Sequence, residues 1–255
     1  MRSNSKKVAF IAAIVLVVSP CLAQNSNFKE IKNNLNLEMI FVQGGTFTMG
    51  CNSGHCEPNE LPTHQVTLSD FYMGKYEVTQ AQWVAVMGSN PSIFKGDNLP
   101  VENVSYGDVQ EFILKLNSLT GKQYRLPTEA ECEFAGRGGT HFSGYEYSGS
   151  DANESVAWYH PNSDNTTHPV GSKFPNKLDI YDMSGNVFEW CNDWYGEYSS
   201  SLQINPQGPS TGTDRVLRGG SWRGKAFYLR MFTRLHVPPE RHDSHYGFRL
   251  ACSSK

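Results

Sequence analysis

Apolar and polar residues alternate between Met39 and Thr79, a pattern that predicts β-strands. The stretch MIFVQGGTFTMG, which starts at Met39, is typical of two short strands separated by Gly44 and Gly45. The stretch HQVTLSDFYMGKYEVT repeats the alternation, and its predicted core positions are Val66, Leu68, Phe71 and Tyr76. The first part of the chain is therefore expected to form a sheet.

Beyond Thr79 the spacing of apolar residues becomes helical at three places. Thr79 can cap a helix over QAQWVAVM. Ser105 opens the stretch SYGDVQEFILKLNSLTG, in which apolar side chains recur every three or four residues until Gly121. Thr128 and Glu131 form a T-x-x-E capping box at the start of EAECEFAGRGG. The sequence therefore predicts three helices after the first strands.

From Gly138 to Val216 no long periodic segment follows, and loops are expected to dominate. A loop region of this length inside a compact domain is uncommon and needs something besides regular hydrogen bonding to order it. Its many aromatic residues argue against disorder, and a bound metal is one way to hold it. We find no linker and no internal repeat, so a single domain is predicted.

The N-terminus has the pattern of a secretory signal peptide. Basic residues precede the apolar run 8–18, and the small residue Ala23 marks the predicted cleavage site. The run is too short for a transmembrane span, which needs about 20 residues. Acylation of Cys21, giving a lipoprotein, is the alternative, although Pro20 fits it poorly. We therefore predict export to the periplasm, cell surface or medium, with a signal peptide at 1–23, a polar leader at 24–37 and one domain at 38–252.

Charge and cysteine content narrow the function classes. The 255-residue chain has a net charge of −3 and no basic stripe, which argues against a nucleic-acid partner. Besides Cys21 there are five cysteines, and Cys51 and Cys56 bracket a short polar loop that a disulfide could close. An odd count leaves at least one thiol unpaired, and the sequence does not pair the remaining three, Cys132, Cys191 and Cys252.

Seven short motifs occur in an order that resembles the sulfatase-modifying-factor family, whose namesake is the formylglycine-generating enzyme. The resemblance runs from about Met39 to Ala251 and rests on GGTFTMG (44–50), YEVTQ (76–80), PVENV (100–104), RLPTEA (125–130), GNVFEW (185–190), RGGSW (218–222) and GFRL (247–250). It implies an α+β fold: a single loop-rich domain of the C-type lectin type, with little regular secondary structure and with bound calcium.

The resemblance also implies where calcium would bind. Mapped onto GNVFEW, the site would use the carboxylates of Asp182 and Glu189 and the backbone carbonyls of Gly185 and Val187. Several oxygens and two negative charges suit a hard cation. An ordinary Asp/Gly turn with a surface glutamate is the alternative interpretation. The family's second calcium site maps poorly onto NESVAWYHPNSDNT and stays open.

The family's enzymatic chemistry is not expected here. Formylglycine-generating enzymes hold copper through two cysteines shortly after the RGGSW motif, and those positions are Gly224 and Leu229 in this chain. Cu(I) favours thiolates, so we do not expect copper to bind. A second branch uses non-haem iron and an additional helical domain, for which the chain has no room. His236, His242 and His245 lie close in sequence, but their spacing matches no common ligand motif.

The segment 223–246 is instead typical of a binding surface. It mixes aromatic, basic and histidine residues without strand or helix periodicity, between two motifs that suit a rigid scaffold. It also resembles the variable segment of retroelement-diversified proteins, some of which share this fold. We therefore predict a non-catalytic domain that binds an unknown protein or glycan; the alternatives are an enzyme acting on exported proteins and a structural component of the envelope. The predicted ligand-binding residues are Arg223, Phe227, Tyr228, His236, His242, His245 and Tyr246.

Overall fold

The computed structural model describes residues 26–32 and 35–254. The predicted signal peptide and Cys21 lie outside the described residues. Among those residues, no helix is both long enough and apolar enough to cross a membrane.

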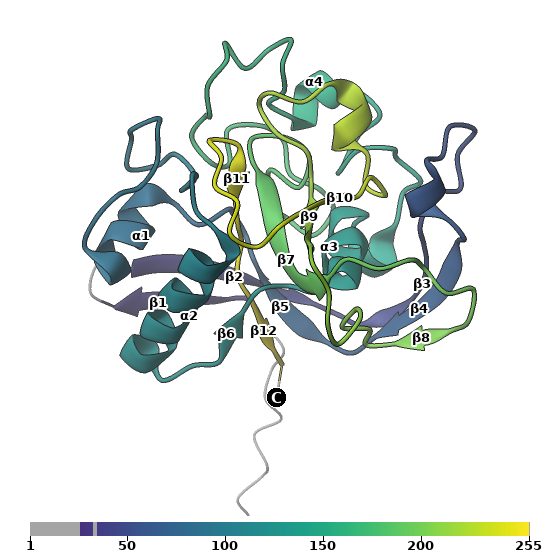
Figure 1. Cartoon of the computed structure of the whole chain (residues 1–255), viewed down its shortest axis with the longest axis horizontal. Helices are drawn as coiled ribbons and strands as arrows, with labels where there is room; N and C mark the ends of the chain where they lie inside the picture. Colours follow the sequence, from purple (N-terminus) through teal and green to yellow (C-terminus); the bar gives the residue numbers. More distant parts are fainter. Residues whose placement is uncertain (1–25, 33–34, 255) are drawn as a thin grey trace, which may run out of the picture.

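Within residues 26–32 and 35–254, the fold consists of three sheets and three main helices (Figure 1). The helices are α1 (Gln80–Met87), α2 (Tyr106–Thr120), α3 (Glu129–Gly136) and the short α4 (Asn153–Val156), with 3-10 turns η1 (Pro58–Glu60), η2 (Gly139–His141) and η3 (Ala226–Leu229). The strands are β1 (Phe28–Lys32), β2 (Leu35–Val42), β3 (Gly45–Met49), β4 (His64–Leu68), β5 (Phe71–Gly74), β6 (Tyr124–Arg125), β7 (Phe188–Trp194), β8 (Gln203–Ile204), β9 (Arg215–Arg218), β10 (Leu235–Val237), β11 (Tyr246–Gly247) and β12 (Ala251–Ser253).

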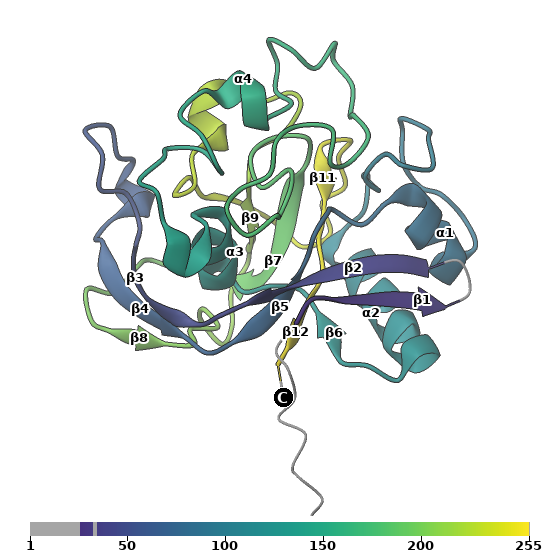
Figure 2. The ribbon, with the colours of Figure 1, turned by 180° about the vertical axis from the view of Figure 1, so that it is seen from behind.

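The described strands form sheets of five, four and three strands. The five-stranded sheet has the order β1-β2-β5-β12-β6, the four-stranded sheet β10-β9-β7-β11, and the three-stranded sheet β3-β4-β8. Figures 1 and 2 show α1 and α2 beside one end of the long sheet, with β3, β4 and β8 at the other. The C-terminal segment crosses from β9 through η3, β10 and β11 before it enters the long sheet as β12. The α+β, loop-rich prediction is confirmed.

The three predicted helices are confirmed, with their caps. Thr79 accepts a hydrogen bond from the Gln82 amide, and Gly88 ends α1 in the left-handed conformation. Ser105 and Thr128 cap α2 and α3 in the same way, each within a capping box. Such a box satisfies amide groups that the first turn of a helix would otherwise leave unpaired.

The fold begins earlier than the sequence predicted. Residues 24–37 were expected to be a leader, yet β1 pairs antiparallel with β2 across this stretch. Leu35 and Leu37 are buried in the main core with Trp83 and Phe112. Two alternating leucines were too few to stand out among the surrounding asparagines. They are nevertheless sufficient to place one face of β2 against α1.

The loop-rich region between Gly138 and Val216 is ordered by backbone turns and by side chains that bond the backbone. Asn176, which is buried, donates from Nδ2 to the Ala135 carbonyl at 2.8 Å and accepts through Oδ1 from the Leu178 amide at 2.9 Å. It thereby ties a loop to the end of α3. A buried amide side chain with partners on both sides replaces part of the regular hydrogen bonding that the region lacks.

Candidate functional site

The C-terminal segment 223–246 is held from inside by Arg218, which ends β9 and is 4% exposed. Its guanidinium donates hydrogen bonds of 2.6 to 3.3 Å to three backbone carbonyls of the segment, those of Met231, Phe232 and Thr233. It also contacts Glu133 Oε2 at 2.7 Å. Burial alone would raise the pKa of Glu133, but Arg137 and Arg218 outweigh it and hold that pKa below its ordinary value.

Two further buried arginines fasten the same segment to its surroundings. Arg230 contacts Glu60 Oε1 at 2.6 Å and donates to the carbonyls of His55 and Phe227. Arg234 forms a two-pronged pair with Glu129, at 2.6 and 2.8 Å. Planar guanidinium groups suit such several-sided bonding. The segment thus keeps one shape with little regular secondary structure.

Most of the predicted ligand-binding residues point outward on this frame. Arg223, His236 and His242 are exposed, Phe227 is 37% exposed and Tyr228 is 41% exposed. A cavity of about 250 Å³ opens beside two of them, Arg223 and Tyr228. Its lining consists of Phe188, Ser221, Arg223, Gly224, Tyr228, Leu235 and His245. We call this cavity the Tyr228 pocket.

The Tyr228 pocket has an apolar wall and a polar floor. Phe188 and Tyr228 present their rings to it, with centroids 6.4 Å apart. Ser221 is 1% exposed, and its hydroxyl has no hydrogen-bond partner among the described residues. A buried hydroxyl without a partner favours a ligand that can bond it. His245 is partly buried there, and burial lowers its pKa, which Asp243 offsets only in part.

Tyr246 corrects the prediction that it points outward, because the structure leaves it only 6% exposed. It lies in β11, which pairs parallel with β7 through Phe188 and Glu189. Its ring packs edge-on against Trp190, with centroids 5.9 Å apart, and joins the main core. An edge of the residue still lines a shallow depression beside His242 and Arg241. Tyr246 is therefore chiefly a core residue.

The three histidines of the segment do not gather into one site. His236 Nδ1 lies 2.5 Å from Asp214, and its ring stacks on Tyr195. His242 Nε2 lies 3.0 Å from Asp108, and His245 Nδ1 lies 2.6 Å from Asp243. Each imidazole thus faces a carboxylate of its own.

The residues expected to bind calcium lie around a buried carboxylate cluster. Glu189, 2% exposed, holds both its oxygens against Arg249 at 2.5 and 2.6 Å. Asp182 accepts a hydrogen bond from the Gly171 amide through Oδ2 at 2.7 Å. The Gly185 amide donates to the Gly219 carbonyl. Because Arg249 engages both oxygens of Glu189, calcium would have to share this carboxylate with the guanidinium.

Glu77 is a member of this cluster that the sequence did not reveal. It is 1% exposed and accepts from Asn186 Nδ2 at 2.6 Å and from the Val187 amide at 3.1 Å. Burial, followed by repulsion from Asp182 and Glu189, raises its pKa well above the ordinary value. Burial also raises the pKa of Asp182 to about 6. Three carboxyl groups therefore face one guanidinium, and either protonation of Glu77 and Asp182 or a bound cation would relieve the repulsion between them.

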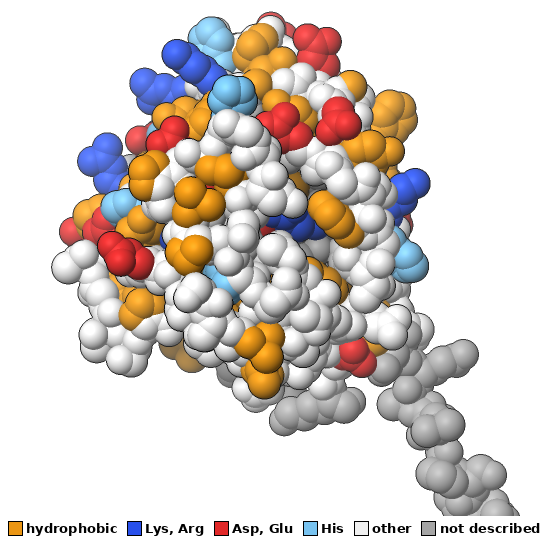
Figure 3. All heavy atoms as spheres, turned by 90° about the vertical axis from the view of Figure 1, so that its right-hand side faces the viewer, with side chains coloured by type: hydrophobic (Ala, Val, Ile, Leu, Met, Phe, Trp, Pro, Cys, Tyr) orange, Lys and Arg blue, Asp and Glu red, His pale blue; other side chains and the backbone are white. Residues whose placement is uncertain are grey.

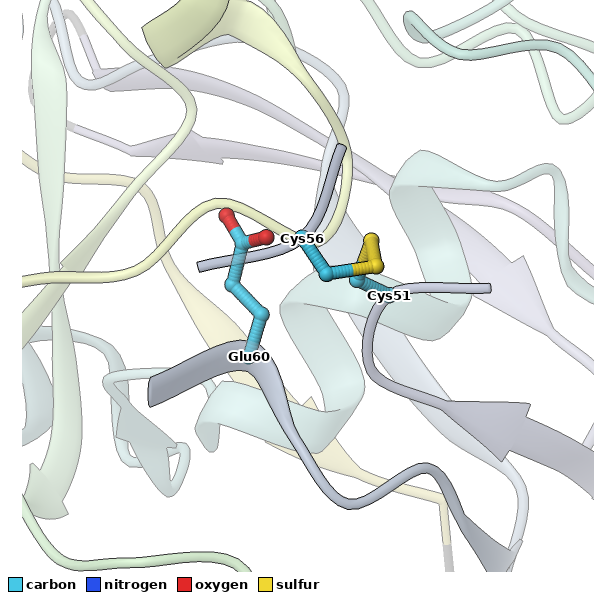
Figure 4. A group of neighbouring side chains, drawn as sticks. All are labelled: Cys51, Cys56 and Glu60. Carbon is cyan, nitrogen blue, oxygen red and sulfur yellow. A yellow bond between two sulfur atoms is a disulfide. The ribbon is translucent and has the colours of Figure 1, made fainter. Parts of the chain in front are cut away.

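Cys51 and Cys56 form a disulfide at the mouth of the loop between them (Figure 4). Among the described residues, their sulfurs and Glu60 are the metal-ligating side chains that come within mutual reach as a group of three. The disulfide occupies both sulfurs, and Glu60 pairs with Arg230. Glu60 therefore helps to hold the C-terminal segment through Arg230, and neither sulfur is free to bind a metal while the disulfide is intact.

Comparison with known proteins agrees with this architecture. The profile of the sulfatase-modifying factor enzyme 1-like domain matches residues 24–254. The chain belongs to this family. It is 37% identical to the chaperone protein LppX of Paenibacillus barcinonensis over 72% of this chain and 78% of that protein. It is 29% identical to the formylglycine-generating enzyme of Thermomonospora curvata over 84% of this chain and 92% of the enzyme.

A solved structure has the same fold as this chain. Treponema denticola variable protein 1 superposes with a TM-score of 0.83 at 32% identity, covering 89% of this chain and 99% of that one. Within the family fold, the positions at which formylglycine-generating enzymes are expected to carry copper ligands are Gly224, on the wall of the Tyr228 pocket, and Leu229, fully buried beside it.

Proposed function

We propose that the chain is an exported, non-catalytic binding domain that captures a protein or glycan through its C-terminal segment 223–246. The observation that carries this proposal is the identity of the residues at positions 224 and 229, neither of which can bind copper through its side chain. Gly224 has no side chain to offer, and Leu229 packs against Ala157 and Tyr159. Without thiolates at these positions, the place of the copper site becomes a cavity open to a ligand.

The composition of the Tyr228 pocket supports binding. Exposed tyrosine and phenylalanine side chains offer large contact area at a low cost in conformational entropy. Arg223 and His245 add polar groups to the lining, and the buried Ser221 hydroxyl has no hydrogen-bond partner among the described residues. An apolar pocket with a few convergent polar groups is the usual form of a ligand site.

We further propose that the outward residues of the segment can vary without loss of the fold. The frame depends on Arg218, Arg230 and Arg234, whereas Arg223, Phe227 and Tyr228 are exposed. The similarity to Treponema denticola variable protein 1, a protein named as variable, supports diversification of this segment. Calcium at Asp182 and Glu189 remains part of the proposal, with the excess of buried carboxylates as its support.

Binders selected from a random peptide library and a glycan array test the function. The variant Arg223→Ala/Tyr228→Ala should weaken a selected ligand at least about tenfold, since buried aromatic anchors commonly dominate an interface. Leu114→Ala/Lys115→Ala, which removes one apolar and one basic exposed residue from α2, is the matched control. Equal affinities for both variants would move the binding site elsewhere.

The enzymatic alternative has its own test. Cu(I) titration of the purified chain, together with a formylglycine assay on a sulfatase-derived peptide, should give neither stoichiometric binding nor product. Copper binding with turnover would replace the proposal by an oxidase that uses ligands other than positions 224 and 229.

A further inference from the structure

A second cavity opens on the face that carries β3, β4 and β8. It has a volume of about 230 Å³, and its lining includes Met49, His64, Trp194, Gln203, Pro206 and Pro209. Figure 3 shows this side of the molecule, where uncharged side chains surround a hollow with a basic side chain visible inside. The cavity shares none of the residues that line the Tyr228 pocket. It is therefore a site separate from the Tyr228 pocket.

Two of the buried charged groups in this cavity are already fully engaged. Arg234 donates to both oxygens of Glu129 and to the carbonyls of Asn59 and Gly196. Glu129 also accepts from the Tyr198 hydroxyl at 3.2 Å. Neither group is left to bind a ligand, so the cavity is not built for an anion.

Asp193 is the exception. It is 4% exposed and projects from β7 into the cavity lining. One oxygen, Oδ2, accepts from the Glu129 amide at 2.9 Å, whereas among the described residues no group donates to Oδ1 and no basic side chain forms an ion pair with Asp193. Burial, and then repulsion from Glu129, raises its pKa to about 8. Arg234 lowers this pKa only in part, so a ligand that brings positive charge would stabilise the charged form of the Asp193 carboxyl.

The geometry restricts what that ligand can be. One open oxygen suits a compact ammonium group better than a planar guanidinium, which prefers two acceptors. A single open oxygen is also too few for calcium, which takes roughly 6 to 8 oxygen ligands. The cavity is smaller than the roughly 300 to 1,000 Å³ of a drug-sized site. Met49, Pro206 and Pro209 supply an apolar wall for a short alkyl chain.

We propose that this cavity binds the ammonium group of a primary alkylamine, with Asp193 Oδ1 as the acceptor and the alkyl chain against the wall of Met49, Pro206 and Pro209. The amine could be a free small molecule or the side chain of a lysine on another protein, since both present the same chemistry. The site goes beyond the function proposed for the Tyr228 pocket and does not depend on it.

Calorimetric titration with n-butylammonium chloride tests the proposal, with 1-butanol as the uncharged probe of similar shape. The wild-type chain should bind the ammonium saturably and the alcohol at least about tenfold more weakly, a gap of about 1.4 kcal/mol. Asp193→Asn keeps an oxygen for the Glu129 amide but removes the charge, and should weaken the ammonium about tenfold or more. Glu197→Gln, at the exposed edge of the cavity, is the matched control and should change the affinity less than about twofold, because exposed charges interact weakly.

Further measurements identify the source of the amine and guard against an unfolded variant. If Nα-acetyl-lysine N-methylamide binds as tightly as n-butylammonium, a lysine side chain fits; if only the free amine binds, the ligand is a small molecule. In the wild-type chain, nuclear Overhauser contacts should join the butyl methylenes to Met49. Arg223→Ala/Tyr228→Ala should leave the ammonium affinity unchanged, which separates this site from the proposed function. Absence of saturable binding, equal binding of butanol, or contacts away from Met49 would overturn the proposal.

Discussion

Residues 218–246 contain buried and exposed side chains of the same types, arginine and tyrosine. We call the buried side chains the inner layer and the exposed ones the outer layer. Arg218, Arg230 and Arg234 are buried, and each bonds both a carboxylate and backbone carbonyls. Arg223 is exposed, at the edge of the Tyr228 pocket. Tyr246 belongs to the core, whereas Tyr228 is 41% exposed. A segment without extended regular structure can thus be rigid beneath and free to change above, because side chains rather than strands fix its backbone.

The largest expected effect comes from the inner layer. Arg218→Met should destabilise the fold by about 3 to 5 kcal/mol, since it leaves Glu133 Oε2 and three buried carbonyls without their donor, while Arg137 continues to pair with Glu133 Oε1. Urea denaturation checks this value. Arg223→Met, an exposed arginine of the same segment, is the control and should stay within about 0.5 kcal/mol of wild type. Similar losses for both variants would remove the distinction between the layers.

The two tyrosines give the next largest contrast. Tyr246→Ala should cost about 3 kcal/mol, as removal of a packed aromatic ring usually does. Tyr228→Ala should cost no more than about 0.5 kcal/mol, because its ring is partly in solvent. Thermal and urea unfolding of both single variants measure the difference. A stable Tyr246→Ala protein would mean that β11 does not bury this side chain.

Calcium should have a smaller effect, through the carboxylate cluster beneath GNVFEW. If the ion binds only the folded state, it should add about 2.7 kcal/mol at a hundredfold excess over its dissociation constant. Asp182→Asn should abolish the gain while retaining the bond from the Gly171 amide. An unchanged melting curve on adding either calcium or a chelator would show that Arg249 and protons alone balance the three carboxylates.

Short-range patterns in the sequence predicted the three main helices and the Cys51–Cys56 loop. Thr79, Ser105 and Thr128 mark helix starts because a capping side chain acts within three residues of its own position. The Cys51–Cys56 loop is equally local, and the structure closes it with a disulfide. The family resemblance supplied the overall architecture, which periodicity alone could not have specified in a region dominated by loops.

What the sequence missed depends on contacts between distant residues. Tyr246 belongs to a strand of two residues, too short to show an alternating pattern, and its burial depends on β7 almost sixty residues earlier. Glu77 joins Asp182 and Glu189 from across the chain. The cavity at Asp193 combines β3, β7, α3 and the loop around Pro206, and no motif unites them. Charged residues in strands gave no hint of burial by themselves.

The most direct test of the two-layer account is a pair of substitution libraries measured by protease resistance on the cell surface. One library randomises the exposed positions Arg223, Phe227, Tyr228, His236 and His242 together, and the other randomises Arg218, Arg230 and Arg234. We expect most members of the first library to resist protease as the wild type does, and most members of the second to be cleaved. Equal loss of resistance in both libraries would contradict the account, because the outer positions would then be part of the frame.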